Sequence, residues 1–88
     1  MAWAVKFDPR AERELAKLDR AAQGRILKFL RERIEGDHNP REVGKALQGP
    51  MAGLWRYRVG DYRLVCQIQS NVLAVFVVRV AHRREVYR

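Results

Sequence analysis

Two clusters of arginine carry most of the chemistry that this sequence offers. The first consists of Arg56, Arg58 and Arg63, and the second lies in the ending 82–88, which reads HRREVYR. Arginine presents a planar fork of donors that suits phosphate oxygens, so both clusters indicate a phosphate-bearing ligand. The second cluster adds a histidine and a tyrosine, which can also transfer protons. The alternatives are a solvated basic tail for the ending, and an ordinary charged outer face of a sheet for the first cluster.

The segments around the first cluster alternate between polar and apolar residues, as two paired strands do. In 54–59 two aromatic residues alternate with Arg56 and Arg58, and 62–68 alternates in the same way around Arg63. The Gly-Asp pair between these segments is typical of a hairpin turn. If the aromatic residues face the core, alternation points all three arginines to the opposite, open face. We expect the end of the chain to place His82, Arg83 and Tyr87 beside them.

The remaining pattern predicts an α+β fold in one domain over residues 1–88. Asp8 and Pro9 begin a helix as N-cap and first helical residue. The segment 72–80 is apolar on both faces until Arg79, which is typical of a central strand. The expected order is an N-terminal strand, a helical hairpin and a three-stranded antiparallel meander (β-α-α-β-β-β), with the helices on one face of the sheet. The expected elements are a strand at 3–7, helices at about 9–19 and 20–34, a connector at 36–53, and strands at 54–59, 62–68 and 72–80.

The charge of the chain indicates a polyanionic partner. Its 88 residues carry a net charge of +8, and fourteen of the eighteen basic residues are arginine. The excess is concentrated late, because residues 51–88 hold seven arginines against two acidic residues. Nucleic acid or an acidic protein fits this distribution. A membrane surface fits less well, since the basic residues lie in strand-like segments rather than along one amphipathic helix.

Other features place the chain in a reducing cytoplasm and predict no cofactor. Cys66 is the single cysteine and lies within a predicted strand, which favours a small buried residue over a nucleophile. The first residues lack the pattern of a signal peptide, and no apolar run is long enough to cross a bilayer. His38 and His82 are far apart, and no cysteine or histidine spacing indicates a metal site.

Taken together, the two arginine motifs resemble a known family. The segment 54–65 (LWRYRVGDYRLV) and the ending 82–88 are similar to the RelE toxins of bacterial toxin–antitoxin pairs, within the RelE/ParE superfamily. Phe7-Asp8 before the helical hairpin and Leu47-Gln-Gly49 before the next strand match as well. The resemblance therefore covers essentially the whole chain.

This resemblance implies a toxin that is an mRNA endonuclease, cutting in the ribosomal A site without a metal. The RNA 2′-hydroxyl attacks the adjacent phosphorus, and the 5′-oxygen leaves. The family's catalytic residues correspond here to Arg56, Arg58, Arg63, Arg83 and Tyr87. We expect the same arginines of the sheet to bind RNA, together with Arg79, Arg84 and Arg88.

One departure from the family concerns proton transfer. The best-known members carry lysines where Arg56 and Arg58 stand, and arginine does not lose its proton in a protein. These two arginines can still bind phosphate and stabilise developing charge. We therefore expect His82 or Tyr87 to transfer protons, and His82 needs the least tuning because an imidazole titrates near neutrality. The alternatives are that His82 only contacts phosphate and that Tyr87 stacks on or orients the substrate.

Two other functions use the same fold or the same charge. The ParE branch inhibits DNA gyrase by binding it, without nuclease activity, and a non-catalytic nucleic-acid-binding module needs only the basic face. The combination of Arg63, Arg83 and Tyr87 favours a ribosome-dependent mRNA interferase that inhibits translation. Both toxin functions imply a RelB-like antitoxin with an acidic toxin-binding segment, in a hetero-oligomer with the toxin. The nuclease also implies the ribosome and mRNA as partners.

Overall fold

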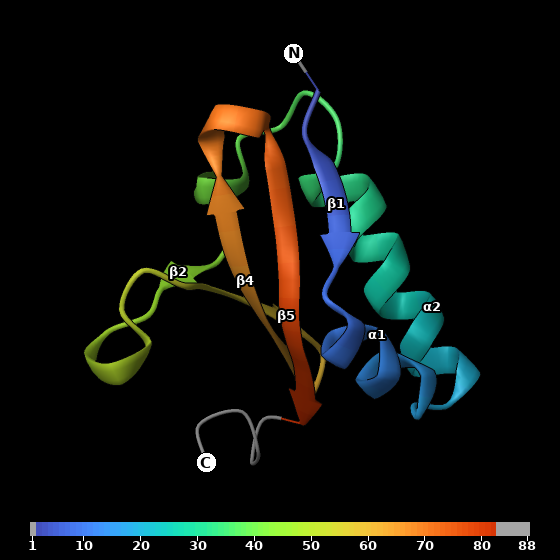
Figure 1. Cartoon of the computed structure of the whole chain (residues 1–88). Helices are drawn as coiled ribbons and strands as arrows, with labels where there is room; N and C mark the ends of the chain where they lie inside the picture. Colours follow the sequence, from blue (N-terminus) through green and yellow to red (C-terminus); the bar gives the residue numbers. More distant parts are fainter. Residues whose placement is uncertain (1, 83–88) are drawn as a thin grey trace.

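The computed structural model describes residues 2–82, and Figure 1 shows how their elements are arranged. None of the helices in this range has the length and apolar content needed to span a bilayer. The predicted α+β class is confirmed. The α-helices and strands, in chain order, are β1 (Ala4–Phe7), α1 (Pro9–Ala16), α2 (Arg20–Phe29) continued by a π-helical turn (Leu30–Ile34), β2 (Lys45–Ala46), β3 (Trp55–Val59), β4 (Tyr62–Gln69) and β5 (Ala74–His82). Short 3-10 turns lie at Pro40–Glu42, Gly49–Met51 and Ser70–Val72.

The helices begin at the residues that the sequence indicated. Asp8 stands at the N-cap of α1 with Pro9 in the first turn, although the Asp8 side chain accepts no capping hydrogen bond. Asp19 caps α2, and its Oδ1 accepts a hydrogen bond of 2.7 Å from the amide of Ala22. The expected helix at 20–34 is confirmed as α2 with its π-helical turn, whereas α1 ends at Ala16, earlier than expected.

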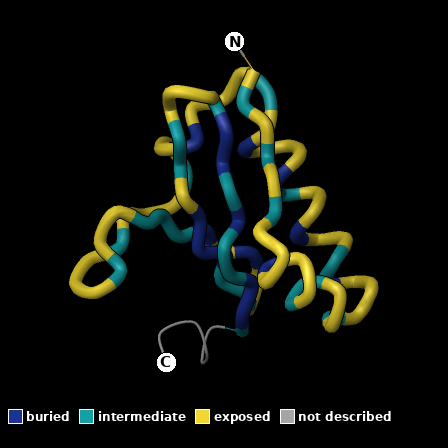
Figure 2. Tube along the Cα trace, in the orientation of Figure 1, coloured by how far each residue is buried: buried dark blue, intermediate teal, exposed yellow. Residues whose placement is uncertain are grey.

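The five strands form one sheet in the order β1-β5-β4-β3-β2. The predicted antiparallel meander of β3, β4 and β5 is confirmed, and β1 joins β5 in parallel. With neighbours on both sides, β5 is buried along much of its length (Figure 2), which explains its apolar sequence. Two features differ from the expectation: the two-residue strand β2 adds an edge to β3, and β5 continues to His82 instead of ending at residue 80.

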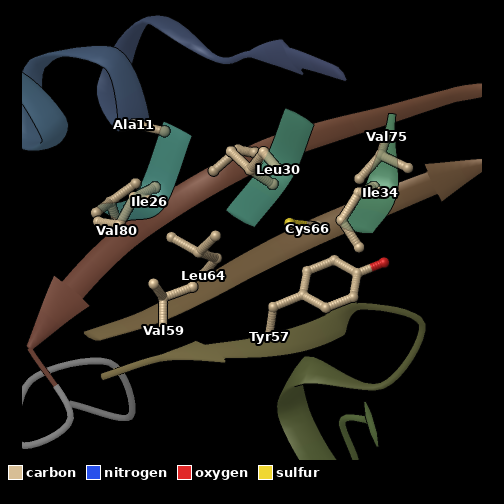
Figure 3. Packing of buried hydrophobic residues seen from close by; sticks show 11 residues of the cluster. Ala11, Ile26, Leu30, Ile34, Tyr57, Val59, Leu64, Cys66, Val75 and Val80 are labelled. Carbon is tan, nitrogen blue, oxygen red and sulfur yellow. The ribbon is translucent and has the colours of Figure 1, made fainter. Parts of the chain in front are cut away.

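The core lies between one face of this sheet and the helices. Ile26 and Leu30 from the helical side meet Leu64 and Val75 from the sheet (Figure 3), and all four are essentially inaccessible to solvent. Tyr57 shares this core, and its hydroxyl donates a buried hydrogen bond of 2.7 Å to the carbonyl of Pro40. Since α1 and α2 lie on the β1 side of the molecule (Figure 1), they leave the outer face of β2, β3 and β4 uncovered by helix.

A β-bulge interrupts the pairing of β4 with β5. Val65 pairs with Arg79 and Cys66 pairs with Val77, so Val78 is an extra residue on β5. The Glu14 carboxylate of α1 contacts β5 next to this bulge. The pairing of β1 with β5 ends just before this point, at Phe7 and Val77. The carboxylate accepts hydrogen bonds from the Val80 amide at 2.8 Å and from Arg79 Nε at 3.0 and 3.2 Å. The bulge and this carboxylate together fix how the last part of β5 runs.

Candidate nucleic-acid interface

Two arginines lie directly opposite each other at the centre of the open face. Arg58 of β3 pairs in register with Arg63 of β4, and Arg63 pairs in turn with Ala81 of β5. Directly opposed residues of antiparallel strands point to the same face, with their Cβ atoms about 4.5–5.5 Å apart. Arg58 is exposed and Arg63 is half-buried, with its Nη1 donating to the Tyr62 carbonyl at 3.3 Å. This pair places two cationic side chains next to each other on the open face.

The next row of the same face extends the positive charge toward the edge of the sheet. Arg56 lies two residues before Arg58 on β3 and pairs in register with Lys45 of β2. Arg56, Arg58 and Lys45 line one hollow of about 240 Å³, together with Val43 and Gly44. The expectation that Arg56, Arg58 and Arg63 share one face is therefore confirmed.

The strands that carry these cations are free of acidic residues. The strands β2, β3, β4 and β5, all within the described part of the chain, contain no aspartate or glutamate. Like charges directly opposite each other on a sheet are destabilising, so the Arg58–Arg63 pair does not by itself stabilise the hairpin. A phosphate bound between the two guanidinium groups would remove that repulsion and accept hydrogen bonds from both.

An apolar cluster limits the basic area on one side. Val65 and Ala81 are buried on the open face, although neither α1 nor α2 covers them. Leu47, Met51 and Leu54, from the segment that connects β2 to β3, pack over them. The basic row thus lies beside a small apolar surface rather than on a flat sheet. A base and its phosphate need such a combination of contacts, since bases stack on apolar groups while phosphates bind cations.

His82 lies on the other face of the sheet, which corrects the expectation that it stands beside Arg63. It pairs with Tyr62, and the two rings meet edge to face with centroids 5.9 Å apart. His82 also lines a hollow with Lys17 and Leu18 of the helical side. The bulge is the physical reason: the extra residue in β5 reverses the alternation, so His82 turns toward the helices and Ala81 turns outward.

Arg79 is engaged within the protein. Its Nε lies 3.0 Å from the Glu14 carboxylate, and the two side chains are only 20% and 22% exposed. This ion pair weighs against the expected role of Arg79 in binding RNA, which stays a prediction. The four other predicted site residues of the ending, Arg83, Arg84, Tyr87 and Arg88, lie outside the described residues.

Lys45 is the residue of this site that the sequence did not reveal. A strand of two residues has no periodicity, and nothing in the 36–53 segment marks Lys45 as a partner of Arg56. The sequence carries one weak signal, which is the glycine before it. The structure shows why glycine stands there: Gly44 has φ of +78°, and a Cβ on this residue would collide with the Arg56 carbonyl oxygen. A glycine before a lone lysine thus marked the close approach of two strands.

Cys66 takes no part in this site. The thiol is buried in the core between the sheet and the helices, and burial raises its pKa well above the usual range. A thiol held in its neutral form is a poor nucleophile. The expectation of a small buried residue is therefore confirmed.

The chain resembles known toxins along nearly its whole length. A family model described as the ParE toxin of the type II toxin–antitoxin system parDE matches residues 5–87. Toxin RelG of Mycobacterium tuberculosis is 38% identical over 90 residues, covering 100% of this chain and 99% of RelG. The mRNA interferase toxin RelE of Escherichia coli is 36% identical over 90 residues, covering 99% of this chain and 92% of RelE. Among solved structures, a chain of the RelBE2 toxin–antitoxin complex from Mycobacterium tuberculosis superposes with a TM-score of 0.79 at 33% identity, covering 94% of this chain and 100% of that one.

Proposed function

The chain belongs to the ParE-toxin family of type II toxin–antitoxin systems as a RelE-type toxin, and from this premise we propose that it is an endoribonuclease that cuts mRNA on the ribosome. The observation that carries the proposal is the opposed pair of Arg58 and Arg63 on a face whose strands hold no acidic residue. The relatives support the nuclease over a gyrase inhibitor, since those at 36–38% identity over 90 residues are named RelE and RelG, and two of them are named mRNA interferases.

The proposed reaction needs charge stabilisation at one phosphate. The RNA 2′-oxygen loses its proton and bonds to the adjacent phosphorus, the bond from phosphorus to the 5′-oxygen breaks, and that oxygen takes up a proton. The products are a 2′,3′-cyclic phosphate and a free 5′-hydroxyl. Negative charge grows on the non-bridging oxygens, where the guanidinium groups of Arg58 and Arg63 would bind. These fixed cations would do the work that a metal does in other nucleases, so we propose a metal-independent reaction.

The remaining catalytic roles follow the family resemblance. Arg56 would hold the substrate beside the Arg58–Arg63 pair, and Arg83 would add a further cation at the phosphate. We assign proton transfer to Tyr87 rather than to His82, because the imidazole faces the helices on the other side of the sheet. Single-turnover rates of Tyr87→Phe and His82→Ala across pH test this assignment. A changed pH profile in His82→Ala, with an unchanged one in Tyr87→Phe, would reverse it.

The family also implies partners. We propose that an antitoxin with an acidic segment binds this chain and keeps it inactive. The solved chain that it resembles is part of the toxin–antitoxin complex RelBE2, which supports such a partner. The net charge of +8 favours such a partner through electrostatic complementarity. Ribosomes and mRNA are the proposed targets, which places the action of the toxin in the cytoplasm.

Cleavage of mRNA on programmed ribosomes tests the proposed function. We expect the purified toxin to cut mRNA in the A site and to leave a 2′,3′-cyclic phosphate, which end mapping identifies. Arg58→Ala and Arg63→Ala should each lower the single-turnover rate by about 100- to 1000-fold, as the loss of one fixed donor to a developing oxyanion does. Arg20→Ala, an exposed arginine of α2, is the matched control and should cut at the rate of the unmodified protein.

Two results would contradict the proposal. Intact mRNA after long incubation with folded toxin would remove the nuclease assignment, and blocked DNA supercoiling by gyrase in the same preparation would replace it. For metal independence, a phosphorothioate at the scissile phosphate is the probe. Rescue of its cleavage by Mn²⁺ would show a metal bound to that oxygen and would overturn the metal-free reaction.

A further inference from the structure

Lys45 holds a fixed place on the basic face. It pairs in register with Arg56, and the two residues line the same hollow as Arg58. Among the described residues of β2 to β5, Lys45 is the only lysine. Its side chain is exposed and no ion pair is recorded for it within the described residues, whereas the exposed Arg10 on α1 does approach a carboxylate. Within the part of the chain that the structure describes, this flexible ammonium group thus stands without an ion pair beside the guanidinium groups of Arg56 and Arg58.

The fold holds this two-residue strand in place with side chains of the core. Trp55 Nε1 donates a hydrogen bond of 2.6 Å to the carbonyl of Val43, just before Lys45. The Tyr57 hydroxyl donates to the carbonyl of Pro40 at 2.7 Å, and both atoms are buried. Beyond the strand, the amide of Leu47 donates to the carbonyl of Leu54 at 3.0 Å. Three hydrogen bonds therefore fix a segment that has no strand propensity of its own.

Lys45 does not belong to the same row as the opposed arginines. Arg58 and Arg63 form one row across the sheet, and Lys45 and Arg56 form the next. Rows that are two residues apart along a strand are separated by about 6.6 Å. This separation is comparable with that of neighbouring phosphates along an extended single strand. When one phosphate of a bound RNA lies on Arg58 and Arg63, the next phosphate along the RNA is therefore within reach of Lys45 and Arg56.

We propose that Lys45 is an RNA-binding residue, which contacts a phosphate adjacent to the scissile one. The proposal rests on the proposed nuclease function and adds a contact to it. Lysine acts as a point charge on a flexible stem, so the contact contributes to binding without a demanding geometry. This contact lowers the toxin concentration needed for cleavage, whereas Arg58 and Arg63 act in the chemical step.

Single-turnover cleavage on programmed ribosomes, measured over a range of toxin concentrations, tests this contact. For Lys45→Met we expect the half-saturating concentration to rise by about 3- to 10-fold, as for an exposed charged contact, with the maximal rate within about twofold. The slope of log affinity against log salt should become shallower by about 0.7, the value for one lost phosphate contact on a single strand. Lys45→Arg keeps the charge and should restore both values. Lys28→Met, at an exposed lysine of α2, is the matched control.

Substituted RNA identifies the phosphate. Two mRNAs are compared, each with a neutral methylphosphonate in place of one of the two phosphates that flank the scissile one. With one of these two mRNAs, the unmodified toxin and Lys45→Met should have equal half-saturating concentrations, because the charge that Lys45 contacts is gone. Equal half-saturation by Lys45→Met and Lys28→Met on ordinary mRNA would overturn the proposal while the nuclease function stands. A Lys45→Arg protein as slow at saturation as Lys45→Met would also overturn it, because lysine would then be needed for proton transfer. An inactive unmodified toxin removes the nuclease function and this contact together.

Discussion

Glu14 makes a contact whose energetic value can be worked out from the structure. Its carboxylate accepts hydrogen bonds from the Val80 amide at 2.8 Å and from Arg79 Nε at 3.0 Å. The Glu14→Ala change removes all of these acceptors at once. The Arg79 and Glu14 side chains are 20% and 22% exposed, so water replaces the lost partners only in part. Glu14→Gln is the milder change, because its amide oxygen can still accept from Val80.

The expected loss of stability follows from these bonds. A hydrogen bond to a charged group contributes about 1.5–3 kcal/mol, and a buried amide left without an acceptor costs about 1–3 kcal/mol. Allowing for partial hydration, Glu14→Ala should lower the free energy of unfolding by about 3 kcal/mol and Glu14→Gln by about 1 kcal/mol. Each kcal/mol corresponds to about 4–8 °C in a domain of this size. The total stability of such a domain is about 4–13 kcal/mol, so the alanine variant loses a large share of it.

Urea and thermal unfolding followed by circular dichroism measure these losses. Glu12→Gln, at an exposed glutamate of the same helix, is the control and should stay within about 0.5 kcal/mol of the unmodified protein. A double-mutant cycle with Arg79→Met should give a coupling energy of about 1–2 kcal/mol. If Glu14→Ala is as stable as Glu12→Gln, or if the coupling is zero, the carboxylate does not hold α1 to β5 and the reasoning fails.

Three further predictions concern β2 and the core. Gly44→Ala places a Cβ 2.2 Å from the Arg56 carbonyl oxygen and should displace β2, raising the half-saturating toxin concentration as the loss of Lys45 does; an unchanged value would mean that β2 tolerates the shift. Cys66 should react with thiol reagents only as the protein unfolds, so labelling that is as fast as for a free thiol in folded protein would contradict its burial. Burial raises the pKa of both Cys66 and Tyr57, so the folded chain keeps these protons longer than the unfolded chain, whose groups titrate near 9.0 and 10.0. The stability that these two protonated groups contribute is therefore complete below pH 9 and should fall as the pH rises above 9; stability in urea that stays constant from pH 8 to 11 would refute this.

The sequence predicted the elements that are set by local chemistry. Alternation places Tyr57 inward and Arg58 outward on β3 whatever the rest of the chain does, and the Gly60-Asp61 turn sets Arg63 opposite Arg58. The start of α1 follows in the same way from Asp8 and Pro9, which stand at its N-cap and in its first turn. The arginine part of the site was therefore predictable, because it depends on one hairpin.

The parts that the sequence did not predict depend on contacts between distant segments. Strand β2 exists because Trp55 and Tyr57 hold the chain before it through hydrogen bonds, and two residues show no pattern of their own. The bulge at Val78 cannot be recognised in an apolar run, yet it decides which face His82 occupies. Both features depend on tertiary structure, so propensity and periodicity carry no information about them.

The parallel pairing of β1 with β5 sets an order for folding. Ala4 pairs with Ala74, which is 70 residues away in the chain. The ribosome makes β1 first, and this strand has no hydrogen-bonding partner until β5 has been synthesised. The hairpin that carries Arg58 and Arg63 needs only a two-residue turn and can form early, whereas closure of the sheet is a long-range event and therefore slow. A chain built in this way closes its sheet only late in its own synthesis, once β5 is available to pair with β1.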